Sequence, residues 1–263
     1  MKTNYDIYKV KIKKEKYMIL SFQIILVVTI FSLWELLAQV GILDKFLFSC
    51  PSEIFNLLIA NIKSNEIFIH VGYSLFETLL ALFIGSFLGI LIAILLWFSN
   101  TLTKIIDPFL VVLNALPKTA LAPILIVWAG TGVKGIVVVA ISLSLVMTII
   151  STLNFFKSVD YEKIKMLKTF GANKIQILFK LILPSNTANL ISVIKINIGL
   201  TWVGVIVGEF LVSRFGIGYI VVYGGQVFKM DLVMMGVFVL AILAFMMYLV
   251  ILLIEKHYKK KKG

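Results

Sequence analysis

Long apolar stretches dominate the pattern of hydrophobic and polar residues along the chain. Three stretches contain no charged residue and are long enough to cross a bilayer: 79–98, 135–156 and 232–254. A fourth stretch, 18–38, carries a single charge, Glu35, near its end. Because a hydrocarbon core of about 30 Å needs roughly 20 apolar residues of helix, these four stretches predict four membrane-spanning helices.

Two further stretches are apolar but less regular. The stretch 108–128 begins at Pro108 and contains Lys118, Pro117 and Pro123, and the stretch 190–212 contains Lys195 and Glu209. Charged residues at membrane depth usually face the interior of a helix bundle or a water-filled cavity. We therefore predict six crossings in an all-α polytopic bundle. The composition agrees, since 60% of the 263 residues are hydrophobic and only 14% are charged.

The net charge of +12 is confined to three segments, 1–16, 157–180 and 255–262, which each carry +4. Six crossings place these three segments on the same side of the membrane. Lys and Arg accumulate in cytoplasmic segments of membrane proteins, so both termini are expected in the cytoplasm of a bacterial cell whose inner membrane holds the chain. This distribution argues against a nucleic-acid partner and for contact with membrane lipid.

The crossings divide the chain into four parts. A basic cytoplasmic segment, 1–16, precedes the first membrane helix and an external loop, 17–70. The main transmembrane domain covers 71–255 and includes a cytoplasmic connection at 157–184, and a Lys-rich tail follows at 256–263. The single cysteine excludes an intramolecular disulfide or a cysteine-built metal site, and no metal site is predicted.

The connection 157–184 is neither a simple turn nor a crossing. Apolar residues recur at helical spacing on both sides of Gly171, which predicts two short amphipathic helices joined at that glycine. One interpretation is a basic helix that lies on lipid headgroups, and the other is a docking element for a cytoplasmic partner. The apolar residues are Ile164, Leu167 and Phe170 before the glycine and Ile175, Leu178, Phe179 and Ile182 after it.

Within this connection, Gly171 is followed ten residues later by Leu-Ile-Leu-Pro at 181–184. This spacing resembles the EAA loop of the permeases of binding-protein-dependent ABC importers, in which a glycine precedes I-x-L-P. Lys165, Met166 and Leu167 stand where the acidic residue and the two alanines of that loop would fall.

The resemblance extends over 70–255 and is strongest to the permeases of sulfonates, taurine and nitrate. The segments that carry it are Leu-Pro-Lys-Thr-Ala-Leu-Ala-Pro at 116–123, Trp-Ala-Gly-Thr-Gly at 128–132, Gly-Glu-Phe at 208–210 and Gly-Ile-Gly at 216–218.

The resemblance implies the MetI-like core of a type I importer, in which a permease homodimer works with two cytoplasmic ATP-binding subunits and an extracytoplasmic solute-binding protein. It further implies a small anionic substrate, with a thiamine-precursor pyrimidine as the alternative. No phosphate-binding loop of the form G-x-x-x-x-G-K-S/T occurs here, so a partner binds ATP and this chain needs no cofactor. The residues expected to contact the ATPase are Leu167, Phe170, Gly171, Ala172, Ile175 and Pro184.

Charged residues within the crossings are the candidates for the substrate path. Lys118 could offer a positive charge to an anion, because the neighbouring proline frees backbone groups that a cavity can satisfy. The alternative is that these residues pair with one another, as Glu77 with Lys195, or reach to the membrane surface. The candidates are Glu77, Pro117, Lys118, Lys195 and Glu209.

Two other functions fit the sequence less well. An enzyme within the membrane is disfavoured, because the two histidines lie at span ends and neither Ser142 nor Ser144 has an evident basic partner. A gradient-driven transporter or channel suits six helices with buried charges, but it has no use for a docking loop.

Overall fold

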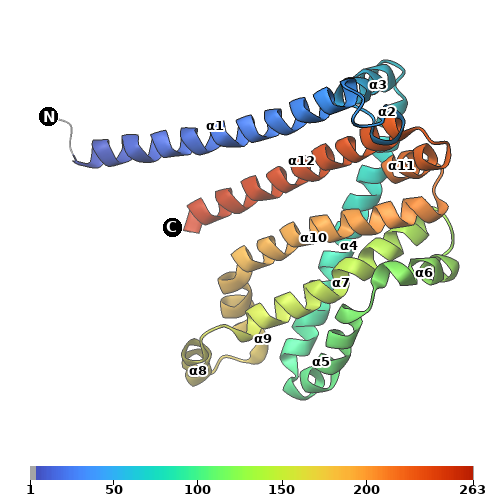
Figure 1. Ribbon diagram of the computed structural model, residues 1–263. Helices are drawn as coiled ribbons and strands as arrows, with labels where there is room; N and C mark the ends of the chain where they lie inside the picture. Colours follow the sequence, from blue (N-terminus) through green and yellow to red (C-terminus); the bar gives the residue numbers. More distant parts are fainter. Residues whose placement is uncertain (1–3, 263) are drawn as a thin grey trace.

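A computed structural model describes the backbone of residues 4–262 and the side chains of residues 12–256. Within this range the chain is helical and contains no strand (Figure 1). The basic segments predicted at 1–16 and 256–263 lie mostly outside the described side chains. The first elements are α1 (Asn4–Gln39), α2 (Lys45–Phe48), α3 (Pro51–Lys63), α4 (Glu66–Phe98), α5 (Asn100–Ala115), the 3₁₀ turn η1 (Lys118–Leu121) and α6 (Ala122–Ala129). They are followed by α7 (Val133–Lys157), α8 (Tyr161–Thr169), α9 (Lys174–Ile177), the π-helical turn η2 (Leu178–Ile182), α10 (Leu183–Val212), α11 (Ile217–Gln226) and α12 (Met230–Lys262).

Five of the predicted crossings are present as helices long and apolar enough to span a bilayer, and the all-α fold class is confirmed. The helices cover 12–39, 66–98, 133–157, 174–212 and 230–256. Figure 1 places the start of α1, the end of α12 and the short α8 at one end of the bundle, with α3 and α11 at the other. The predicted topology likewise puts both termini and the long connection on one side.

The predicted crossing over 108–128 is not a single straight helix. It consists of α5 and the segment Lys118–Ala129, which are bent by 86° relative to each other. Counted together as one broken span, they bring the number of spans among the described residues to six. Leu116 adopts an extended conformation at the bend, with φ −64° and ψ 139°. Pro117 explains this break, since proline disfavours the helical conformation in the preceding residue and cannot donate a backbone hydrogen bond.

The prediction of two separate short helices in the connection 157–184 is wrong for the second helix. α8 is short and separate, but residues from Lys174 onward form one continuous helix of 39 residues with α10. Pro184 does not end this helix because the preceding turn, η2, is π-helical, and the N–H of Leu183 bonds to the carbonyl of Leu178. A wider turn accommodates the proline ring that would otherwise clash.

The centre of the bundle is formed by α4, α7 and α10, which approach one another closely at small residues. A Cβ atom added at Gly89 would lie 2.6 Å from the side chain of Thr148, and one at Gly204 would lie 2.4 Å from Cα of Ala140. Close backbone approach of this kind is typical of membrane helix packing. The buried Asn197 amide joins all three helices, since it donates to Thr148 Oγ1 at 2.7 Å and to Ser86 Oγ at 3.2 Å.

α1 contacts the rest of the chain mainly near its C-terminal end. Glu35, its one charge at membrane depth, accepts hydrogen bonds from the backbone N–H of Ser52 at 3.0 Å and from its hydroxyl at 2.8 Å. These bonds cap the N-terminus of α3, where a negative charge is favourable. The indole of Trp34 stacks on Phe238 of α12. No residue of α1 from Ile12 to Leu37 is buried within the chain.

Candidate functional site

The segment between α8 and α9 has a conformation that depends on glycine. Gly171 has a φ of +78°, a left-handed conformation in which other residues are strained. Its N–H bonds to the carbonyl of Lys168 at 2.9 Å, and the N–H of Ala172 bonds to that of Leu167 at 3.0 Å. This pair of bonds is a Schellman motif, which closes the C-terminus of α8. The predicted turn at Gly171 is therefore confirmed.

Both ends of the connection are capped by side chains. Asp160 accepts a hydrogen bond from the N–H of Glu162 at 2.9 Å and begins α8. Asn173 and Gln176 form a reciprocal capping box that begins α9. This box was not predicted from the sequence, although an asparagine followed three residues later by glutamine is a signal for it. The caps fix the entry and exit angles of a segment only 16 residues long, 158–173.

The residues expected to contact the ATPase point in two directions. Phe170 and Ile175 are exposed, at 80% and 59%, and the glycine between them is exposed as well. Leu167 and Ala172 instead pack against the buried cluster formed by the inner ends of α4 and α7 and the start of the long helix. Pro184 is exposed on α10. Two exposed side chains of α8 were not predicted from the sequence: Met166 adds to the apolar surface beside Phe170, and Tyr161 lines a cavity next to the bundle.

Glu209, a candidate for the substrate path, is bound at the end of the bundle opposite α8, where it caps α11. Its carboxylate accepts hydrogen bonds from the hydroxyl of Ser74 and from the N–H of Gly218, both at 2.5 Å. Ser74 Oγ in turn accepts from the N–H of Ile217 at 2.7 Å. The first turn of α11 thus has its free N–H groups satisfied by side chains of α4 and α10.

Glu77 lies beside Glu209 and is hydrogen-bonded to it, and both carboxyl groups are buried. A hydrogen bond between two carboxyl groups requires one of them to carry the hydrogen. Both oxygens of Glu209 already accept hydrogen bonds, from Ser74 and from Gly218. Glu77 is therefore the group that donates the hydrogen bond between the two carboxyl groups. The second oxygen of Glu77 has no hydrogen-bond partner among the described residues.

Lys195 does not pair with Glu77, contrary to the alternative considered from the sequence. Its ammonium contacts Glu255 near the end of α12 at 2.6 Å, and it lies 5.8 Å from the ring centroid of Tyr248. The structure therefore separates the Glu77–Glu209 carboxyl pair from a distinct ion pair between α10 and α12. It does not bring them together around one path.

Lys118 lies at the bend that Pro117 creates between α5 and α6. Its ammonium donates to the carbonyl of Asn114 at 3.3 Å and lies 3.5 Å from the side-chain oxygen of that residue. It has no acidic partner among the described residues. Of the two lysines among the candidates, Lys118 is the one without an acidic partner among the described residues.

Comparison with protein families identifies the chain. A family model described as the inner membrane component of binding-protein-dependent transport systems matches residues 85–262. This chain belongs to that family. The match begins within α4 and extends into α12, so it includes the α8 connection, the bend at Lys118 and Glu209, and leaves out Glu77.

Curated relatives are transport permeases. The chain is 27% identical over 220 residues to a putative aliphatic sulfonates transport permease protein, SsuC, of Bacillus subtilis, covering 83% of this chain and 79% of the relative. It is 25% identical to the taurine transport system permease protein TauC of Escherichia coli, covering 83% and 81%. It is 28% identical over 187 residues to the formylaminopyrimidine transport permease protein ThiX of Halalkalibacterium halodurans, covering 71% and 74%.

A solved structure of the MetNI methionine ABC transporter in an inward-facing conformation has the same fold. The TM-score is 0.59 at 18% identity, over 73% of this chain and 96% of the matched chain. The predicted MetI-like architecture is confirmed. The chain is the permease subunit of an ABC importer and is not itself an enzyme.

Proposed function

We propose that this permease imports a small anionic solute of the sulfonate or taurine class. In this proposal two copies form the pathway in a bacterial inner membrane, with both termini in the cytoplasm. A solute-binding protein delivers the solute from outside, and a separate cytoplasmic subunit binds and hydrolyses ATP. The names of the SsuC and TauC relatives support this substrate class. A thiamine-precursor pyrimidine is the alternative, supported by the ThiX relative.

The two-sided arrangement of α8 is the observation that carries the coupling part of the proposal. Phe170 presents an exposed apolar side chain beside the left-handed turn, where a groove on the ATPase can hold it. Leu167 and Ala172 hold the same segment against the bundle. Closure of the ATPase subunits on ATP displaces α8, and its inward side chains pass that displacement to the membrane helices.

Dependence on ATP tests the proposed function. The full-length chain, purified from its native host, carries along an ATP-binding subunit, and uptake into vesicles stops when ATP hydrolysis is blocked. Uptake that continues without hydrolysis and follows an ion gradient identifies a secondary transporter and contradicts the proposal.

Lys118 is the residue we assign to the substrate path. Lys118→Ala lowers uptake of an anionic solute by about tenfold, the order expected when one unscreened charge contact is lost. Lys118→Arg, which keeps the charge, retains most of the uptake. The measurement is the concentration dependence of uptake in membrane vesicles.

Lys134→Ala is the matched control, because Lys134 is exposed in the first turn of α7. It is expected to transport normally. Kinetics of Lys118→Ala equal to those of the control show that Lys118 only supports the bend at Pro117.

A further inference from the structure

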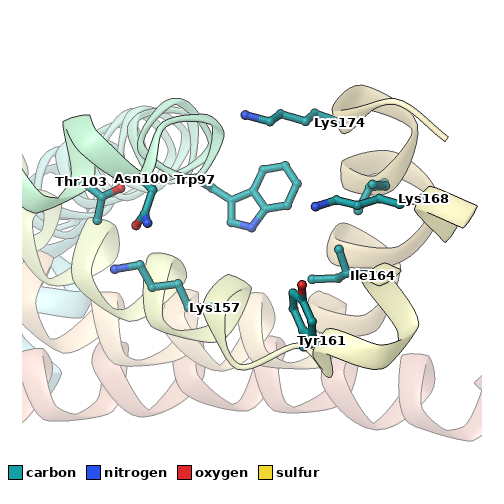
Figure 2. A pocket seen from close by; sticks show the side chains of 9 residues that line it. Trp97, Asn100, Thr103, Lys157, Tyr161, Ile164, Lys168 and Lys174 are labelled. Carbon is teal, nitrogen blue, oxygen red and sulfur yellow. The ribbon is translucent and has the colours of Figure 1, made fainter. Parts of the chain in front are cut away.

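A basic cavity of about 360 Å³ lies between α8 and the inner ends of the membrane helices. Figure 2 shows three lysines around this cavity: Lys157 extends toward Asn100, and Lys168 and Lys174 extend toward the indole of Trp97. They come from α7, α8 and α9. None of the three is in an ion pair with a described residue, and no acidic residue is among the described residues that line the cavity.

The remaining wall of the cavity also favours an anion. Asn100 and Thr103 belong to the first turn of α5, a 16-residue helix whose N-terminus carries partial positive charge. Lys174 donates one hydrogen bond to the carbonyl of Phe98 at 3.0 Å. Since an ammonium has three donors, this bond leaves two, and it anchors the lysine at the rim.

We propose that this cavity binds a phosphate group, specifically the headgroup of an anionic phospholipid of the inner leaflet. Three unpaired ammonium groups and a helix N-terminus match the charge of a phosphate. A tryptophan between the ends of membrane helices is typical of the headgroup region. Exposed apolar side chains on the neighbouring turns of α4 and α5, Leu95 and Leu102, provide a surface for the acyl chains.

A phosphate in this cavity connects α8 to the bundle by charge. Lys168 and Lys174 lie on either side of Gly171, whereas Lys157 and the N-terminus of α5 belong to the bundle. The bound headgroup therefore braces the segment that moves, in addition to the apolar contacts of Leu167 and Ala172. Binding itself is a property of this chain and does not depend on the importer function proposed above.

The test measures the binding of short-chain phosphatidylglycerol to the full-length protein by native mass spectrometry, with any subunit that co-purifies. The variant K157Q/K168Q/K174Q is expected to bind at least about tenfold more weakly than the unmodified protein, because lysines near a membrane surface add roughly independent attraction for anionic lipid. The control variant K163Q/K165Q/K180Q makes the same charge change at exposed lysines outside the cavity. It is expected to bind within about twofold of the unmodified protein.

A second variant removes no lysine. Asn100→Asp places a carboxylate in the cavity at the first position of α5, where a negative charge favours the helix. It is expected to weaken lipid binding while the melting temperature stays unchanged. Inorganic phosphate and phosphatidylcholine are the competing probes.

The probes separate the sources of the phosphate. Bound phosphatidylglycerol that neither inorganic phosphate nor phosphatidylcholine displaces confirms the lipid headgroup. Displacement of phosphatidylglycerol by inorganic phosphate, with phosphate binding lost in the triple variant, supports a phosphate site in this cavity and identifies free phosphate as its ligand. Equal binding by all variants, or equal loss in the triple variant and its control, overturns the proposal.

Discussion

Gly171→Glu is expected to abolish transport while the protein still inserts into the membrane. The glycine has a φ of +78°, where a side chain costs roughly 1–2 kcal/mol. No atom lies within 4 Å of a Cβ added there, so the new carboxylate projects outward beside Phe170. A charge on this apolar face opposes seating in a partner groove. Uptake should fall to background, and the ATP-binding subunit should no longer co-purify.

Gly41→Glu provides a control with the same strain and the same charge. Gly41 has a φ of +80° with no atom near an added Cβ, and it lies in the turn after α1 at the opposite end of the bundle. This variant should keep its ATP-binding subunit. Gly171→Asn should keep much of the activity, because asparagine tolerates the left-handed conformation. Normal uptake by Gly171→Glu contradicts the docking assignment.

Glu209→Gln is expected to destabilise the protein far more than Glu77→Gln, although both substitutions remove a buried carboxyl group. Glu209 uses its two oxygens to accept from Ser74 and Gly218. An amide offers one oxygen, so its NH₂ group then faces a donor, at a cost of about 1–3 kcal/mol. Glu77 donates the hydrogen bond to Glu209, and the amide of a glutamine at this position can donate the same bond. Thermal unfolding in detergent measures the difference.

Glu66→Gln, at an exposed position in the first turn of α4, should leave the unfolding temperature unchanged. If Glu209 instead serves the substrate path, Glu209→Gln should unfold like this control and lose uptake alone. Equal destabilisation by Glu77→Gln and Glu209→Gln contradicts the assignment of donor and acceptor.

Much of the architecture could be predicted from the sequence because lipid imposes simple requirements. An uncharged run such as 135–156 has few alternatives to a spanning helix, and the structure places α7 there. The break at Pro117 was harder, because a proline inside an apolar run either kinks a helix or ends it. The course of the chain past Pro184 was also not predictable, since the π-helical turn before it leaves no pattern in hydrophobicity.

The site was predicted only in part. The spacing of Gly171 and Pro184 located the connection, and Gly171 itself followed from the need for a left-handed turn. Helical spacing groups Leu167 and Phe170 on one amphipathic helix, but Phe170 is the residue after α8 ends, so the two side chains diverge. The pairing of Lys195 with Glu255 joins residues 60 positions apart, which sequence spacing alone does not reveal.

The uninterrupted helix from Lys174 to Val212 links events on the two faces of the membrane. Its 39 residues correspond to a path of about 58 Å along the helix axis. It begins two residues after the Schellman turn, and near its other end Glu209 holds the start of α11. In the proposed cycle, a tilt imposed by the ATPase at the α8 end therefore reaches the opposite face of the membrane through one rigid helix.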